Sequence, residues 1–174
     1  MLSDRDIKSR RGLDVRGASV EPASLDLHLA NKFAVIDDSE PVDVADKSTY
    51  PDTTIVTGDT FTIQPHEFVL AETDEYVELP IDVSGILHGR SSLGRLGLFV
   101  ENAGFVDPSF EGTLTLELFN AAPYPITLHS GMRIIQMVLF ETKNTPSAGY
   151  GRENGNKYSG QTGPTTSKLY NDFE

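Results

Sequence analysis

The chain has 174 residues, which is enough for one sizeable hydrophobic core but short for two, so we expect a single domain over residues 1–174. The sequence contains no cysteine, which excludes a disulfide framework and also the zinc-dependent deaminases, whose metal site needs paired cysteines. The formal net charge of −12 argues against binding to nucleic acid or to an anionic membrane, although locally converging basic groups could still bind a small anion.

The N-terminal stretch MLSDRD does not resemble a signal peptide, and the longest apolar runs are only a few residues long. We therefore expect a cytoplasmic protein without a membrane-spanning segment. Ser3 and Asp6 have the spacing of a capping box, which predicts a short helix through Ile7 that ends in the polar run 8–11.

From Pro22 onward the hydrophobic pattern has a period of two, which is typical of strands. Leu25, Leu27 and Leu29 alternate with Asp26 and His28, so we expect a half-buried strand there. Further strands are expected at 54–56, 60–63, 67–73, 76–79, 83–88, 113–120, 126–128 and 132–141. The polar segment 37–52 contains two prolines and is interpreted as a surface loop. Many short strands with few helical turns predict an all-β barrel, sandwich or jelly roll.

After residue 141 the composition shifts to glycine, asparagine, serine, threonine and tyrosine. A segment of this composition, about 142–174, cannot bury a core of its own and is expected to be flexible. It carries Tyr150, Lys157 and Gln161, which are either simply solvated or close as a lid over a bound ligand.

The strand expected at 113–120 contains one glutamate outside the apolar pattern. Leu114, Leu116 and Leu118 share one face of this strand, whereas Glu117 and Phe119 lie on the other. A solvated glutamate is the simplest interpretation. The neighbouring aromatic favours a covered face instead, and a carboxylate in a partly apolar site has a raised pKa and can transfer protons near neutral pH.

The run Arg90-Ser91-Ser92-Leu93-Gly94-Arg95 follows a strand and is typical of a helical turn capped by Ser91. Backbone N–H groups, hydroxyls and a guanidinium at such a turn can bind phosphate oxygens. The alternative is a plain cap with two surface arginines. Asp107, before Pro108, is either an ordinary turn residue or an acceptor for a sugar hydroxyl.

Together these segments resemble a known family. The stretches LSDRDI, PASLDLHL, GRSSLGRLGL, AGFVDPSFEG, LTLELFN and GYGRENGNKYSGQTG are similar, in order and spacing, to the dCTP deaminase family of the trimeric dUTPase-like superfamily. The resemblance extends from residue 2 to about 167. It implies an all-β, dUTPase-like distorted β-barrel or jelly roll with short helical turns, assembled as a homotrimer with active sites between subunits.

The resemblance also implies residue roles. Glu117 would be the general acid/base, and Ser91 and Arg95 would act with it by orienting the water, the base and the phosphates. Asp107 would bind the deoxyribose 3′-hydroxyl. The implied substrate-binding set is Arg90, Ser91, Ser92, Leu93, Gly94, Arg95, Asp107, Thr115, Leu116, Glu117, Gln136, Tyr150, Lys157 and Gln161. Mg²⁺ would be held mainly by the substrate phosphates, with no direct protein ligand.

The implied function is the hydrolytic deamination of dCTP to dUTP and ammonia, which supplies dUTP and dUMP for thymidylate synthesis. The alternatives are a bifunctional enzyme that continues to dUMP and pyrophosphate, a non-catalytic nucleotide sensor, and a structural β-domain. The family also implies dUTP as a further ligand and dTTP as an inhibitor. Ala103-Gly104 resembles the bifunctional members, whereas the loop expected at 99–102 is one residue shorter than their pattern and lacks a histidine.

Overall fold

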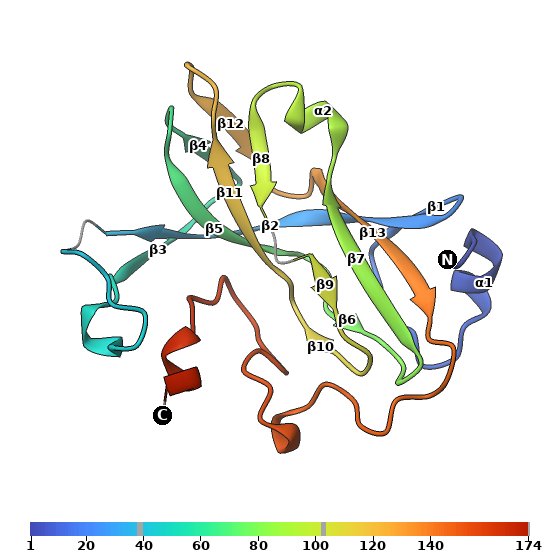
Figure 1. Ribbon diagram of the computed structural model, residues 1–174. Helices are drawn as coiled ribbons and strands as arrows, with labels where there is room; N and C mark the ends of the chain where they lie inside the picture. Colours follow the sequence, from blue (N-terminus) through green and yellow to red (C-terminus); the bar gives the residue numbers. More distant parts are fainter. Residues whose placement is uncertain (38–39, 102–103, 174) are drawn as a thin grey trace.

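The structure is a computed structural model that describes residues 1–37, 40–101 and 104–173 (Figure 1). Within these ranges, the helical segments are α1 (Asp4–Ser9), η1 (Lys47–Thr49), α2 (Ser91–Gly94), η2 (Arg152–Asn154) and η3 (Leu169–Phe173). The strands are β1 (Ser19–Glu21), β2 (Ser24–Ile36), β3 (Thr53–Thr57), β4 (Thr60–Ile63), β5 (Phe68–Thr73), β6 (Val77–Glu78), β7 (Val83–Gly89), β8 (Leu98–Glu101), β9 (Phe105–Val106), β10 (Glu111–Gly112), β11 (Thr115–Asn120), β12 (Ile126–His129) and β13 (Arg133–Glu141). The all-β prediction is confirmed.

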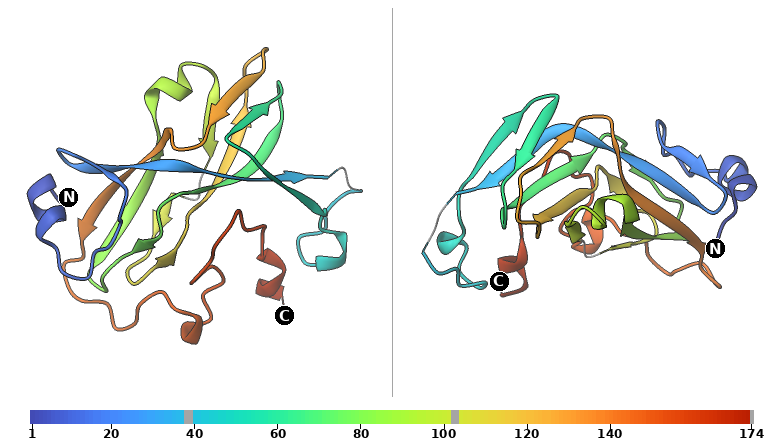
Figure 2. Two further views of the ribbon diagram at one scale, coloured as in Figure 1. Left: turned by 180° about the vertical axis from the view of Figure 1, so that it is seen from behind. Right: turned by 90° about the horizontal axis from the view of Figure 1, so that it is seen from above.

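One curled sheet dominates the described chain. Its main path runs β8-β11-β5-β2-β13-β7-β9, and β1 and β3 both pair with β2. The long strand β2 connects the two halves of the sheet, because its first part pairs with β13 and its later part pairs with β5 and β3. A register shift in the β2–β5 pairing between Leu29 and Phe33 marks an irregularity in this ladder. The resulting half-barrel is visible from above in Figure 2.

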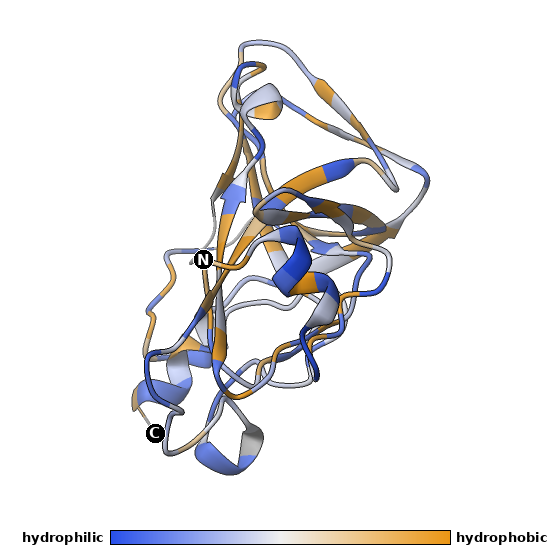
Figure 3. Cartoon of the chain, turned by 90° about the vertical axis from the view of Figure 1, so that its right-hand side faces the viewer, coloured by the Kyte–Doolittle hydropathy of each residue, from blue (hydrophilic) through white to orange (hydrophobic). Residues whose placement is uncertain are grey.

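The inner face of the curled sheet carries one hydrophobic cluster. It includes Leu25 and Leu27 of β2, Leu116 and Leu118 of β11, and Met137 of β13. Figure 3 shows the hydrophobic colour concentrated on the strands, whereas the helix beside the N-terminus is mostly hydrophilic. Because alternate side chains of a strand point to opposite faces, the leucines of β11 enter this cluster and leave Glu117 on the other face.

Three local expectations need correction. The strand at Leu25 is not half-buried, because Asp26 is as buried as the leucines beside it. The segment expected as a loop at 99–102 forms strand β8 up to residue 101 and pairs with β11. The strands β1, β9 and β10 carry only two or three residues each and were not predicted. Strands this short leave too little sequence for a period to be visible.

The predicted N-terminal capping box is confirmed. Ser3 and Asp6 exchange hydrogen bonds at the start of α1, and Ile7 of this helix is buried. The backbone N–H of Leu2 donates to the carbonyl of Leu139 at 2.8 Å, so the N-terminus is joined to β13. None of the helices in the described ranges is long and apolar enough to cross a membrane.

The segment after residue 141 runs back across the molecule at the end of the sheet opposite α2 (Figures 1 and 2). Its last turn, η3, meets the loop that was expected at the surface, because Tyr170 packs edge-on against Tyr50 with ring centroids 5.5 Å apart. The loop thus remains largely exposed but reaches the tail. The flexibility predicted for the tail stays a prediction.

Candidate active site

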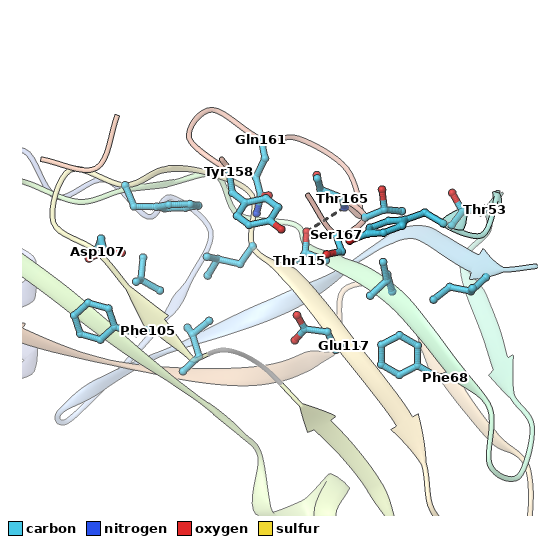
Figure 4. Close-up of a pocket in the computed structure, with 18 of the residues that line it drawn as sticks. Thr53, Phe68, Phe105, Asp107, Thr115, Glu117, Tyr158, Gln161, Thr165 and Ser167 are labelled. Atoms are coloured by element: carbon cyan, nitrogen blue, oxygen red, sulfur yellow. Dashed lines mark hydrogen bonds between the residues drawn. The ribbon is translucent and has the colours of Figure 1, made fainter. Parts of the chain in front are cut away.

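A cavity of about 470 Å³ lies between strand β11 and the tail. Its floor includes Thr115 and Glu117 of β11, and one end is lined by Asp107 and Phe105 (Figure 4). Tail residues cover it from above, and the other end is lined by apolar side chains of β2, β5 and the loop before β3. The remaining described lining residues are Ile36, Tyr50, Pro51, Thr53, Phe68, Leu70, Leu87, Val106, Phe110, Leu114, Tyr150, Tyr158, Gln161, Thr165, Thr166 and Ser167.

Glu117 lies where the period of the strand predicted it. The leucines on either side are fully buried in the core, whereas Glu117 and Thr115 are half-buried on the opposite face. The backbone of Glu117 is paired with Leu70 of β5 and with residue 101 of β8. Figure 4 shows its carboxylate in the cavity, between Phe105 and Phe68. Two flanking strands thus fix the position of a carboxylate in a largely apolar cavity.

Asp107 belongs to the same cavity. It follows strand β9, and its carbonyl accepts the backbone N–H of Phe110 at 3.1 Å, which closes the turn expected at Asp107-Pro108. Ser109 in this turn has a φ of 66°, a left-handed conformation that is uncommon outside glycine and asparagine. The turn places the Asp107 carboxylate at the end of the cavity, away from Phe68.

Tyr150 joins the tail to this turn. Its backbone N–H donates to the carbonyl of Pro108 at 2.7 Å, and its ring packs against Phe110 with centroids 5.9 Å apart. The phenol oxygen accepts the backbone N–H of Tyr158 at 3.2 Å. Burial raises the pKa of Tyr150 above its ordinary value, so the phenol stays protonated at neutral pH.

Gln161 joins the tail to the segment 112–113, beginning with an isolated β-bridge to Gly112 of β10. The backbone N–H of Thr113 donates to the Gln161 carbonyl at 3.0 Å, and the side-chain Nε2 of Gln161 donates to the Thr113 carbonyl at 2.8 Å. The side-chain Oε1 is buried and accepts no hydrogen bond within the described part of the chain. An oxygen acceptor suits a ligand hydroxyl or a water molecule better than a phosphate oxygen.

Lys157 is not brought to the cavity. Its ammonium forms an ion pair with Asp172 of η3, and its side chain is 22% exposed. The backbone carbonyl of Lys157 also accepts a hydrogen bond from the ammonium of Lys168 at 2.8 Å. The tail therefore places its predicted phosphate-binding lysine against its own C-terminal turn.

The turn at Ser91 forms, but its predicted cap is wrong. Arg90 occupies the N-cap position of α2, no side chain caps the turn, and Ser91 is the first helical residue. The N–H of Leu93 donates to the Arg90 carbonyl at 3.0 Å, and the N–H of Arg95 donates to the Ser91 carbonyl at 3.0 Å. Leu93 is buried and anchors the turn, which leaves Ser91, Ser92, Gly94 and Arg95 exposed.

Arg90 and Gln136 meet at a second place on the sheet. Gln136 is paired with Asp26 of β2 on one side and with His88 of β7 on the other. The Gln136 amide donates to the Asp26 carboxylate at 3.4 Å, and the guanidinium of Arg90 contacts the same carboxylate. Neither these residues nor the described residues of α2 line the cavity of Glu117.

Apart from Lys157 and Leu116, the predicted site residues thus form two groups in one chain. The first group, which we call the cavity group, consists of Asp107, Thr115, Glu117, Tyr150 and Gln161. The second, the cationic group, consists of Arg90, Gln136, the α2 residues 91–94 and the C-cap residue Arg95. Leu116 has only its backbone to offer a ligand, since its side chain is in the core. Among the described residues that line the cavity there is no lysine or arginine, so a triphosphate there would lack a cation.

Sequence reasoning missed several lining residues. Tyr158 and the stretch 165–167 lie in the tail, and Tyr50 and Thr53 lie at the end of the surface loop. Tyr158 falls inside a stretch that carried the family resemblance and could have been selected from it. The loop residues had no recognisable signal, because only the folded chain brings them to the tail. The Ala103 of the bifunctional pattern and Asn102 lie outside the described residues.

The chain is similar to known proteins over most of its length. Residues 1–142 match the model of the family described as dCTP deaminase-like. The chain is 46% identical over 157 residues to a protein of Hydrogenobaculum sp. named dCTP deaminase, dUMP-forming, with 90% of this chain and 85% of the relative covered. Among solved structures it resembles the 2′-deoxycytidine 5′-triphosphate deaminase of Agrobacterium tumefaciens, with a TM-score of 0.61 and 25% identity. That match covers 79% of this chain but only 47% of the other. The native dUTPase of EIAV shows the same fold, with a TM-score of 0.52, 15% identity, and 79% and 92% of the two chains covered.

Proposed function

The chain belongs to the dCTP deaminase-like family, and from that premise we propose that it deaminates dCTP hydrolytically to dUTP and ammonia. The observation that carries the proposal is the placement of Glu117 and Asp107 in one cavity with the tail above it. A half-buried carboxylate in an apolar cavity suits proton transfer, and a second carboxylate at the end of the cavity suits a sugar hydroxyl.

Glu117 is the general acid/base in this proposal. Its carboxylate takes a proton from a water molecule as the water oxygen forms a bond to C4 of cytosine. Glu117 passes this proton to N3 of the ring, where it remains in the uracil product. It then carries the proton of the new C4 hydroxyl to the exocyclic amine, and the C4–N bond breaks as the C4 carbonyl forms and ammonia leaves. One carboxylate can serve both transfers because it is protonated and deprotonated twice in each cycle. The flanking strands β5 and β8 hold it in place.

The nucleoside is bound by the rest of the cavity group. Asp107 accepts the 3′-hydroxyl of the deoxyribose, and the backbone of Thr115 and Leu116 contacts the base edge. In the described residues, the pairing of β11 with β8 begins only at Glu117, so the backbone at Thr115 and Leu116 is not paired with β8. Tyr150 and Gln161 close the tail over the ligand.

A neighbouring subunit supplies the cationic group. The cavity lacks a cation in its described lining, whereas Arg90, Arg95 and the serines of α2 lie elsewhere on the same chain. Beside the cavity, Phe68, Phe119 and Phe99 form a row across β5, β11 and β8, and two of them are more than a third exposed. Such an apolar row favours cover by a second copy. We therefore infer a homotrimer in which Ser91 and Arg95 orient the water and the phosphates across the interface.

Mg²⁺ fits this arrangement as a partner of the triphosphate. Hard cations take oxygen ligands, but the cationic group offers hydroxyls and guanidinium groups, and the buried Asp26 carboxylate beside it already contacts Arg90. Phosphate oxygens and water would therefore hold the ion, and bound Mg²⁺ would neutralise part of the phosphate charge. Arg90, Ser92 and the backbone at Leu93 and Gly94 would bind the remaining phosphate oxygens, together with Gln136 and Lys157.

A second candidate function is favoured by one observation. The Hydrogenobaculum relative is named dUMP-forming, which describes an enzyme that continues from dUTP to dUMP and pyrophosphate. The overall reaction would consume two water molecules and release one ammonia and one pyrophosphate per dCTP. This candidate requires the same cavity and adds attack of water on the phosphate chain.

One experiment separates these functions. The purified protein is incubated with dCTP and Mg²⁺, and separately with dUTP, while ammonia, dUTP, dUMP and pyrophosphate are followed. Ammonia with dUTP supports the first proposal, and ammonia with dUMP and pyrophosphate supports the second. Tight dCTP binding without any product would support a sensor instead. In the matched variant Glu117→Gln, ammonia release should be abolished while dCTP still binds, so full activity in this variant would exclude the mechanism.

A further inference from the structure

Asp26 occupies an unusual environment for a strand carboxylate. It lies in β2, and its side chain is 2% exposed. Charged groups are rarely buried this deeply unless they are paired, because an unpaired buried charge costs several kilocalories per mole. Asp26 has three donors around it: the Arg90 guanidinium, Nη1 of Arg133 at 3.2 Å, and Nε2 of Gln136 at 3.4 Å.

These partners come from neighbouring strands. Gln136 is directly opposite Asp26 in the β2–β13 pairing, and Arg90 follows directly after β7, the next strand. Paired residues of adjacent strands point to the same face, so the sheet itself places the carboxylate beneath the amide and the guanidinium. The Asp26 side chain is therefore buried within the paired strands, whereas the Arg90 side chain is partly exposed.

We propose that Asp26 is a positioning residue, which holds Arg90 and Gln136 in the orientation that binds the triphosphate of the substrate. The inference rests on the proposed function, since it takes these two residues to contact the phosphates. Asp26 contacts Nη1 of Arg90, so the opposite edge of the guanidinium, with Nε and Nη2, remains able to face an anion. The same contact holds the first residue of the α2 turn, because Arg90 is its N-cap.

Net charge alone would have the opposite effect on phosphate binding. Asp26 carries a negative charge close to the place where a polyanion would bind, so its removal should strengthen phosphate binding if only net charge mattered. If orientation matters more, removal should weaken binding, because the free arginine would lose its fixed rotamer and would have to be ordered by the ligand. The sign of the effect in Asp26→Asn therefore decides between the two explanations.

The test uses the full chain with dCTP and dCMP as probes. Binding is measured in the Glu117→Gln background, where turnover does not interfere. Loss of one charge-assisted contact corresponds to a decrease of about 10- to 100-fold in dCTP affinity for Asp26→Asn. The affinity for dCMP should change less than about threefold, because it lacks the outer phosphates. In the otherwise native enzyme the KM for dCTP should rise more than kcat falls.

Two comparisons show whether Asp26 acts through Arg90. Glu21→Gln is the matched control. Among the three donors around Asp26, Glu21 contacts only Arg133, at 3.2 Å, so this variant should leave dCTP binding unchanged. In an Arg90→Gln background, Asp26→Asn should cause little further loss of dCTP affinity. If Asp26→Asn does not fold, as judged by circular dichroism and gel filtration, Asp26→Glu replaces it and should show the same selective loss for dCTP.

Three results would separate the positioning role of Asp26 from the proposed function. Tighter or unchanged dCTP binding in Asp26→Asn, or an equal loss for dCTP and dCMP, would overturn the inference. A full additional loss in the Arg90→Gln background would also overturn it. Ammonia release by the wild-type protein tests the proposed function separately. If the wild type binds dCTP but releases no ammonia, the proposed function fails, whereas a selective dCTP-binding defect in Asp26→Asn would still support the positioning role.

Discussion

The backbone N–H of Gly163 donates to Oε2 of Glu72 at 2.6 Å, which connects the tail to a buried carboxylate of strand β5. The same oxygen accepts the hydroxyl of Thr113 at 2.8 Å. Thr113 is the residue that pairs with Gln161, so this one carboxylate supports both sides of the tail's docking site. Glu72 thus fixes the part of the tail that covers the cavity.

The first prediction follows from this contact. Replacing Glu72 by glutamine removes the charge from the acceptor, and hydrogen bonds to charged groups contribute about 1.5–3 kcal/mol. The tail should therefore open about ten times more often, and backbone amides at 160–165 should exchange with deuterium correspondingly faster. Lys32→Gln is the control, because the Lys32 ammonium is 4.0 Å from Oε1 of Glu72, whereas the tail binds Oε2. Equal exchange in wild type and Glu72→Gln would contradict the role of Glu72.

The second prediction concerns the shared active site. Arg95→Ala and Glu117→Gln should each be inactive alone, because each removes one half of every site. If Glu117 and Arg95 of one site come from adjacent subunits of a trimer, every mixed trimer of the two variants contains one intact site out of three. About three quarters of the trimers refolded from equal amounts of the two variants are mixed. The mixture should therefore recover about a quarter of the wild-type activity. Ammonia release from dCTP is the measurement. Complete inactivity of verified mixed trimers would show that the site does not cross the interface.

The third prediction concerns the lysine of the tail. Asp172 forms an ion pair with Lys157 and would compete with a substrate phosphate for its ammonium. In Asp172→Asn the KM for dCTP should fall by up to about fivefold, because exposed ion pairs contribute at most about 1 kcal/mol. The decrease should become smaller at high salt. Asp172→Glu keeps the carboxylate and should resemble the wild type. A higher KM in Asp172→Asn would indicate that this ion pair helps the tail to close.

The fourth prediction concerns acid stability. The Arg10 guanidinium donates to Asp82 and lowers the pKa of that carboxyl below its ordinary value. Because the folded-state pKa is depressed, the ion pair stabilises the protein above the unfolded pKa of about 3.9, and this stabilisation is lost as the pH falls through the folded-state value. Asp82→Asn should therefore lower the melting temperature at pH 7. The difference should shrink below about pH 4. A difference that is constant down to pH 3 would assign the effect to packing.

Local patterns in the sequence predicted several parts of this structure. The period of two placed Glu117 opposite three leucines, because the alternation of side chains depends only on the backbone of that strand. The capping box at Ser3 was recognisable for the same reason, since both partners lie within one helical turn. The cap at Ser91 was misplaced by one residue, because the start of so short a turn depends on the strand before it.

The family resemblance named candidate site residues but not their arrangement. It included Arg90, Gln136, Glu117 and Lys157, and the structure separates these residues into different places on one chain. Short motifs give the identity of side chains, whereas distances between motifs depend on strand order and on the path of the tail. The contributions of Tyr50 and Tyr158 to the cavity depend on the same path and were therefore not predicted.

The sequence alone determined the all-β class, the outward face of Glu117 and the family, because each depends on residue type and on spacing along the chain. Only the tertiary structure decided that Asp26 is buried beneath Arg90 and that the tail covers the cavity of Glu117. Both result from pairings between residues far apart in the sequence, on a sheet whose curvature buries β2 on both faces. Local periodicity carries no information about such long-range pairings.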